Sequence, residues 1–208
     1  MNLTPPRLAT SLLHALTLSD HPVVGDLDEA FRGGHSNAWY WGQTFAIIAA
    51  APLSYLTRQP LRALRGLAVG WAVCLAVFEV FELFIAPTLL LAIYGRPIIG
   101  SWPVFWIAAC VCSYVGFIAS AWIVARVQGT EAGPSLLIYI ASILAAMLIA
   151  VGIVQLHAPQ PTRVPHVFFP LVSVGLPYQW RSGLVLAPLT MLVAGMIATR
   201  GGRQRAAE

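Results

Sequence analysis

The sequence predicts an all-α fold: an integral membrane helical bundle with four firm spans plus a shorter first membrane-associated helix, preceded by a two-helix amphipathic head. The first observation behind this prediction is composition. Of 208 residues, 58% are hydrophobic and 10% are charged, whereas soluble domains carry about 25% charged residues. The second is the presence of four long runs with almost no charge, since about 20 apolar residues cross the hydrocarbon core as a helix.

The four spans are expected near residues 67–85, 104–125, 135–156 and 184–199. Their borders carry arginine or tryptophan, as membrane boundaries commonly do: Arg65 precedes the first run, Trp102 precedes the second, and Trp180 precedes the last. We therefore expect a transmembrane bundle over residues 58–199 and a basic tail over residues 200–208.

The earlier run, over residues 37–57, leaves two interpretations open. Its strictly apolar part is about 14 residues long, Pro52 interrupts it, and Gln43 lies near its start. Such a helix either lies in the membrane interface or spans the bilayer. The aromatic residues at its start, Trp39, Tyr40 and Trp41, suit the headgroup layer.

Arginine placement predicts the orientation. The arginines expected on one side are Arg58, Arg62, Arg65, Arg126, Arg200, Arg203 and Arg205, and those expected on the other are Arg96, Arg163 and Arg181. The positive-inside rule places the side with more arginines, and with it the C-terminus, in the cytoplasm. The expected location is therefore the inner (cytoplasmic) membrane of a cell. We expect a cytoplasmic head as well, because a charged segment without a signal sequence would otherwise be translocated.

The head, residues 1–36, is predicted to form two short helices, the second over residues 22–32. Leu8, Leu12 and Leu16 are expected to form one apolar stripe on the first helix, and Val23, Leu27 and Phe31 to lie on one face of the second. These stripes can pack on each other, on the bilayer surface or on a partner. Asp26 and Glu29 fall on another face of the second helix, which Gly33 and Gly34 should end.

Two segments resemble the permease prefix domain that precedes certain bacterial ABC-type export permeases. They are Gly-Asp-Leu-Asp-Glu-Ala-Phe-Arg at residues 25–32 and Trp-Tyr-Trp-Gly-Gln at residues 39–43, against family patterns of approximately GDLxEEFxxR and WYWRQ. Ala30 stands in place of the usual second glutamate and Gly42 in place of the usual arginine. The resemblance implies a cytoplasmic head but no activity, and the remaining chain is similar to short bacterial membrane proteins that carry this head on a small bundle.

The head motif consists of Gly25, Asp26, Leu27, Asp28, Glu29, Phe31, Arg32, Trp39, Tyr40, Trp41 and Gln43. A docking site for a protein partner and a membrane-hugging hairpin without a partner are both compatible with these residues.

Glu79 and Glu82 form an acidic pair inside the first predicted span. Three positions apart, they share a helix face, and a carboxyl at membrane depth costs about 3 kcal/mol on insertion scales. One hypothesis is a proton or cation relay. The other is a structural role, with the partners expected among Tyr94, Ser113, Tyr114, Arg96, Arg163 and Arg181.

Other features predict packing rather than chemistry. The cysteines lie in apolar runs, and His157 and His166 lack accompanying carboxylates or cysteines in their loop, so we expect no disulfide framework, metal or cofactor. Small residues at four-residue spacing indicate close helix packing or a homo-oligomer seam. They are Cys112, Gly116 and Ser120 in one run and Ser142, Ala146 and Ala150 in the next.

Three classes of function follow. The first is a non-enzymatic accessory or regulatory membrane protein whose head docks a partner, and the alternative is a small proton- or cation-coupled transporter or channel. An enzyme is least favoured, because the spans contain no Gly-x-Ser-x-Gly, His-Glu-x-x-His or paired aspartates. The arginines flank apolar blocks instead of forming a basic stripe, which argues against nucleic-acid binding and leaves the lipid bilayer as the expected environment.

Overall fold

The structure, a computed structural model, describes residues 4–16, 22–85, 88, 102–157 and 180–207. Every regular element within these residues is helical, in agreement with the predicted all-α class. In chain order the elements are α1 (Arg7–Leu16), α2 (Pro22–Arg32), α3 (Asn37–Arg58), α4 (Pro60–Val80), the π-helix η1 (Phe81–Ile85), α6 (Trp102–Gln128), the 3-10 helix η3 (Gly129–Glu131), α7 (Ala132–His157) and α9 (Trp180–Ala207).

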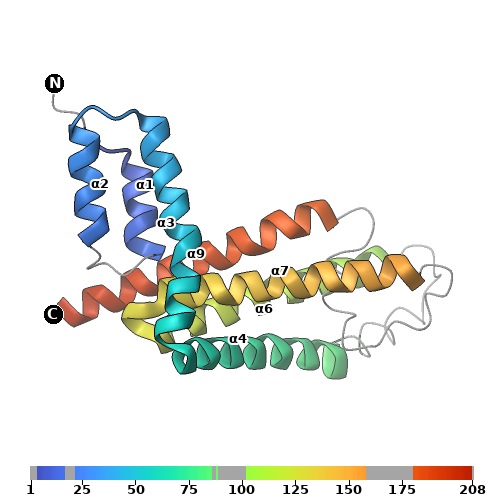
Figure 1. Cartoon of the computed structure of the whole chain (residues 1–208). Helices are drawn as coiled ribbons and strands as arrows, with labels where there is room; N and C mark the ends of the chain where they lie inside the picture. The colour runs from blue at the N-terminus through green and yellow to red at the C-terminus, as the bar shows by residue number, and fades with distance from the viewer. Residues whose placement is uncertain (1–3, 17–21, 86–87, 89–101, 158–179, 208) are drawn as a thin grey trace.

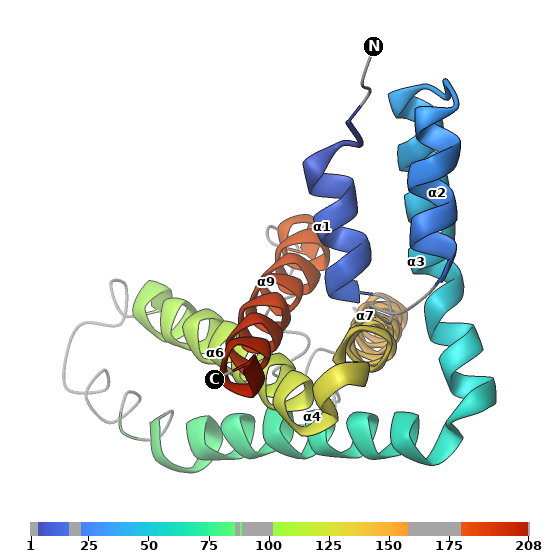
Figure 2. The ribbon, with the colours of Figure 1, turned by 90° about the vertical axis from the view of Figure 1, so that its left-hand side faces the viewer.

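The helices form two groups that run crosswise to each other (Figure 1). Helices α1, α2 and the first half of α3 stand side by side and form the head, whereas α4, α6, α7 and α9 pack on one another and form the bundle. In Figure 2, where α7 is seen nearly end on, the head helices stand crosswise to it.

Helix α2 has the predicted bounds, and its end has the predicted cause. The chain leaves the helix through Gly34, whose φ of 109° lies in the left-handed region that favours glycine. Helix α3 begins with Ser36, whose hydroxyl oxygen accepts a hydrogen bond from the Trp39 backbone N–H at 3.2 Å. These two local signals place α3 directly beside α2.

The head core includes Leu16, Leu27 and Phe31 of the predicted apolar stripes but not Leu8 or Val23. Leu8 is 73% exposed, and Val23 is also exposed. The residues that face inward are Ala9, Leu13 and Leu16 in α1 and Val24, Leu27 and Phe31 in α2. At Leu8–Ala9, Leu12–Leu13 and Val23–Val24 two apolar residues follow one another, so their chemistry alone does not determine which of the two is buried. Packing against the neighbouring head helices determines it.

Helix α3 begins at Asn37, directly after the predicted head, and its start supplies Tyr40 to the head core. The predicted headgroup role of the aromatic run is therefore wrong for Tyr40, which is fully buried. Trp39 and Trp41 are half-buried at the edge of the same core.

The bundle has an apolar core that all four helices share. Helix α6 packs on α4, α7 and α9, and α7 also packs on α4 and α9. The buried core residues are Cys74, Phe78, Phe117, Ala121, Val124, Leu136, Tyr139, Ile140, Ile143, Met147, Ala187, Met191 and Ala194. The predicted packing role of Gly116 and Ser120 is confirmed: both are buried, and Gly116 lies against Val77 of α4.

Three helices are long and apolar enough to span a membrane: Pro60–Val80, Cys110–Gln128 and Ala132–Ile149. These segments correspond to the first three predicted spans, and their length and composition indicate a membrane protein. The fourth predicted span corresponds to a shorter apolar helix, Val185–Thr199, within α9. Helix α3 is not among the three.

The head lies at the end of the bundle that carries the turn between α6 and α7 (Figures 1 and 2). Helix α1 contacts α7 and α9 there, and a Cβ on Gly133 would come within 2.6 Å of the Leu16 carbonyl carbon. Arg126, whose guanidinium lies 4.8 Å from the centre of the Trp122 ring, belongs to the same end. The head thus adjoins the end of the bundle for which the sequence predicts most of the arginines.

Candidate functional site

The head motif residues divide into an inward set and an outward set. Leu27, Phe31 and Tyr40 are buried together, with the rings of Phe31 and Tyr40 edge to face at a centroid distance of 5.4 Å. On the outward side, Gly25, Asp26, Glu29, Arg32 and Gln43 are exposed. Half of the motif therefore builds the head, and the other half presents a surface.

A hydrogen bond ties the two segments of the motif together. The Tyr40 hydroxyl donates to Asp28 Oδ1 at 2.7 Å and lies 3.3 Å from Thr10 Oγ1, so that one buried ring joins all three head helices. Burial raises the pKa of the Tyr40 hydroxyl, and the neighbouring Asp28 carboxylate raises it further. Asp28 is therefore a structural residue of the head.

The exposed part of α2 is a compact charged surface, here called the α2 outer face: Gly25, Asp26, Glu29 and Arg32. Successive members are one, three and three positions apart, which groups them on one side of a helix. A Cβ added at Gly25 would meet nothing within 4 Å, so this face is open. It presents two carboxylates beside one guanidinium, groups that form charge-assisted hydrogen bonds.

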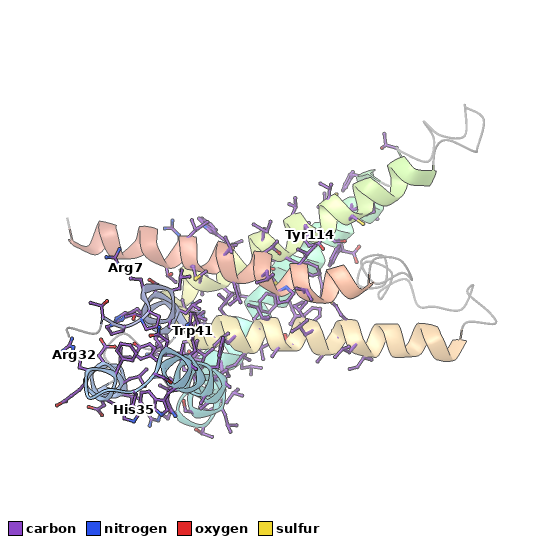
Figure 3. The ribbon with its side chains drawn as sticks, turned by 90° about the horizontal axis from the view of Figure 1, so that it is seen from above. Arg7, Arg32, His35, Trp41 and Tyr114 are labelled. Carbon is purple, nitrogen blue, oxygen red and sulfur yellow. The ribbon has the colours of Figure 1, made fainter. Side chains whose placement is uncertain are left out.

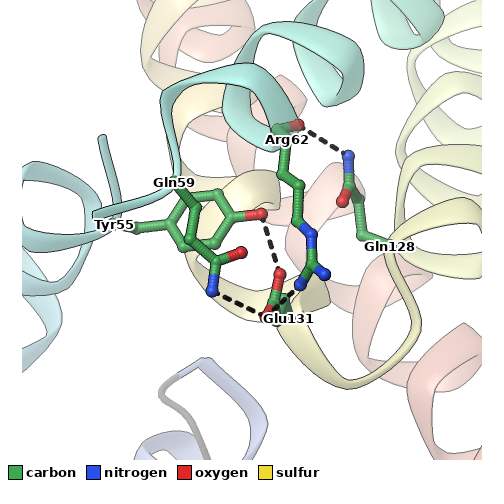
Figure 4. Close-up of polar contacts among 5 residues, drawn as sticks. All are labelled: Tyr55, Gln59, Arg62, Gln128 and Glu131. Carbon is green, nitrogen blue, oxygen red and sulfur yellow. Dashed lines mark hydrogen bonds and ion pairs between the residues drawn. The ribbon is translucent and has the colours of Figure 1, made fainter. Parts of the chain in front are cut away.

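A second polar cluster, which the sequence analysis missed, locks the corner between α3 and α4 (Figure 4). Glu131 accepts hydrogen bonds from Arg62 Nη1 at 2.6 Å, Gln59 Nε2 at 3.0 Å and the Tyr55 hydroxyl at 3.3 Å. Gln128 Nε2 donates to the Arg62 carbonyl oxygen at 3.0 Å. The start of α4 is thereby tied to the turn between α6 and α7.

The contacts within this corner cluster shift the pKa values of its members. Burial favours a higher pKa for Glu131, but hydrogen bonds from Arg62 and Gln59 outweigh burial and hold the pKa below its ordinary value. Burial and the Glu131 carboxylate raise the pKa of Tyr55 to about 12. A signal for this cluster did exist in the sequence: Glu131 is an acidic residue between two predicted spans, close to the arginines that mark the same membrane side.

Inside the bundle, hydrogen bonds link several polar side chains of neighbouring helices. The Tyr139 hydroxyl is hydrogen-bonded to Ser120 Oγ at 2.9 Å and to the Gly70 carbonyl oxygen at 3.1 Å. Trp71 Nε1 donates to Ser142 Oγ at 3.1 Å. Such bonds join neighbouring helices where no water competes.

Of the predicted acidic pair, the structure describes only the side chain of Glu79, which is not part of the bundle core. Glu79 is exposed on α4, and the side chain of Glu82 lies outside the described side chains. Within the described residues, no group of three or more histidine, cysteine, aspartate or glutamate side chains could hold a metal ion. The expectations for Tyr94, Arg96, Arg163 and His166 fall outside the described residues, as do those for the side chains of His157 and Arg181.

Comparison of the chain with protein-family models, curated proteins and solved structures finds no match. The resemblance of the head to a permease prefix domain therefore stays a prediction.

Proposed function

We propose that this chain is a non-enzymatic accessory or regulatory protein of the bacterial inner membrane whose head docks a protein partner, and that the head is a permease prefix domain. The observation that supports docking is the division of the motif: Leu27, Phe31 and Tyr40 stabilise the head, whereas the α2 outer face is exposed. Charged residues that contribute nothing to the core are suited to recognition by a polar partner.

In this proposal α9 is the fourth span. Its side chains follow the pattern of the other bundle helices, with apolar residues on both the inner and the outer side. Ala187, Met191 and Ala194 are buried, and the outer residues Val185, Leu189, Val193 and Ile197 are about half exposed or more. An outer surface of this kind suits lipid. The positive-inside rule then places the head and both termini in the cytoplasm.

The α2 outer face can be tested with a photoreactive amino acid at position 25, where an added side chain meets no neighbour within 4 Å. In living cells we expect one protein adduct of defined mass. Asp26→Asn combined with Glu29→Gln should lower its yield about tenfold or more, because bonds to charged groups contribute about 1.5–3 kcal/mol each.

The matched control is Glu79→Gln, which changes an exposed carboxylate on the bundle instead of the head. It should leave the adduct unchanged. The absence of a protein adduct at position 25, or an adduct that persists at full yield in the Asp26→Asn/Glu29→Gln variant, would refute docking through this face.

Proton or cation transport by Glu79 and Glu82, the alternative, has no supporting observation among the described residues. Glu79 is exposed on α4 and is not part of the core cluster. Intramembrane carboxylates that serve a relay normally face the bundle interior or a water-filled cavity.

A further inference from the structure

The exposed side of α3 carries an apolar stripe along most of the helix. The stripe consists of Trp41, Phe45, Ala49, Leu53 and Leu56, and at 3.6 residues per turn these positions fall within about a third of the helix circumference. Phe45 is 59% exposed and Leu53 is 68% exposed. Trp41 stacks on Phe45 with the ring centroids 5.5 Å apart, so the two aromatic side chains form one surface.

The side of α3 opposite the stripe is polar. Gln43, Ser54 and Thr57 are exposed there, and helical geometry groups them roughly opposite Trp41 and Phe45. A third side, with Tyr40, Thr44 and Tyr55, is buried against the head and the bundle. Helix α3 therefore has one side that packs against the rest of the protein, one polar side that suits water, and one apolar side that no described residue covers.

The position of α3 indicates what covers the stripe. The helix runs crosswise at the end of the bundle (Figures 1 and 3). Because the bundle helices would cross the bilayer lengthwise, a helix placed crosswise at their ends lies along the membrane surface. Figure 3 shows Trp41 on the side of the head turned toward the bundle, where the bilayer would be, and Arg32 on the far side.

The stripe is also continuous with the outer surface of the first span. Leu61 and Leu64, at the start of α4, are 80% and 62% exposed, and they follow Leu56 across the corner. Arg58 and Arg65 are exposed at the same corner, as expected at the boundary between acyl chains and headgroups. The Glu131 cluster holds this corner and with it the angle between α3 and α4.

We propose that α3 is an interfacial helix whose stripe rests in the boundary between headgroups and acyl chains, holding the head flat on the membrane. The occupant is lipid, and the helix does not cross the bilayer. Burial of such a face typically reaches about 5–10 Å into the interface. The stripe and the α2 outer face share no residue, so this inference does not depend on partner docking.

Depth measurements by spin labelling test the proposal. Cysteines at positions 45 and 56 on the stripe, and at positions 43 and 54 on the polar side, are labelled in a chain whose native cysteines are replaced by alanine. The chain is reconstituted in phosphatidylcholine vesicles that contain phosphatidylglycerol. Collisions with oxygen should exceed those with a water-soluble nickel chelate at 45 and 56, and the reverse should hold at 43 and 54.

The two stripe positions also distinguish an interfacial helix from a crossing helix. Positions 45 and 56 are about 16 Å apart along a helix, so a crossing helix would place them at different depths, whereas an interfacial helix places them at equal depth. Different depths, or equal access of the nickel chelate at positions 45 and 43, would overturn the proposal. So would dipolar broadening at 45, which would show a second copy against the stripe.

A photoreactive phenylalanine analogue at position 45 provides a second measurement that keeps the native cysteines, including the buried Cys74. We expect lipid adducts at position 45 and none from the same analogue at position 43. Adducts to protein alone at position 45 would contradict the proposal.

Discussion

The head and the bundle both bury apolar side chains, but they expose opposite kinds of residue. The head places large apolar side chains such as Leu13 and Phe31 inside and charged residues such as Glu29 outside, as water requires. The bundle leaves Leu148, Val193 and Ile197 on its outer surface and joins its helices through Tyr139 and Ser120. The surface of the head therefore suits water and the surface of the bundle suits lipid, and α3 connects these two regions.

The largest expected effect concerns the head core and compares two leucines of α1. Leu13→Ala removes a fully buried side chain and should destabilise the head by about 2–5 kcal/mol. Leu8→Ala removes a side chain that is 73% exposed and should change stability by less than about 0.5 kcal/mol. Hydrogen exchange of α1 and α2 in reconstituted protein measures both, and equal effects would contradict the observed inward face.

The next effect concerns close packing in the bundle and compares two glycines. Gly70→Ala would place a Cβ within 2.6 Å of the Tyr139 ring, whereas a Cβ at Gly152 meets nothing within 4 Å. We expect Gly70→Ala to cost about 1–3 kcal/mol and Gly152→Ala to be neutral or slightly stabilising, because alanine favours helix. Thermal unfolding in detergent tests this, and a neutral Gly70→Ala would argue against the contact between α4 and α7.

The smallest effect concerns the corner between the two regions. Glu131→Gln removes the charge that Arg62 and Tyr55 contact and should cost about 1 kcal/mol at neutral pH, because Arg62 is largely exposed. The pKa of Glu131 is lowered in the folded protein. Its contribution is therefore fully present above the ordinary value of 4.5 and is lost as pH falls through the folded value.

Wild-type protein and Glu131→Gln should thus differ in unfolding temperature at neutral pH and converge in acid. The exposed Glu29 supplies the control, since Glu29→Gln should leave the unfolding temperature unchanged. A difference between wild type and Glu131→Gln that persists in acid would indicate that the charge of Glu131 is not what stabilises the corner.

Particular residues show how far prediction from sequence reached. The bounds of α2 were predicted because Gly33 and Gly34 are local signals that need no partner. The inward face of α1 was not, because Leu12 and Leu13 are chemically alike and the contacts with α2 and α3 decide between them. The same holds for the candidate site. The head motif was found as a sequence pattern, but the sequence did not predict that Tyr40 would be buried and Glu29 exposed.

By itself, the sequence determined which regions suit lipid and which suit water. Composition and the length of the apolar runs predicted the helical class, the first three spans and the charged head. These features depend only on local chemistry and on the thickness of a bilayer. Only the tertiary structure decided which side chains meet. Tyr40 reaches Asp28 and Thr10, and Glu131 reaches Arg62 across 69 positions of the chain. Such pairs arise from the crossing of helices, a property of the packed chain that no local stretch of residues contains.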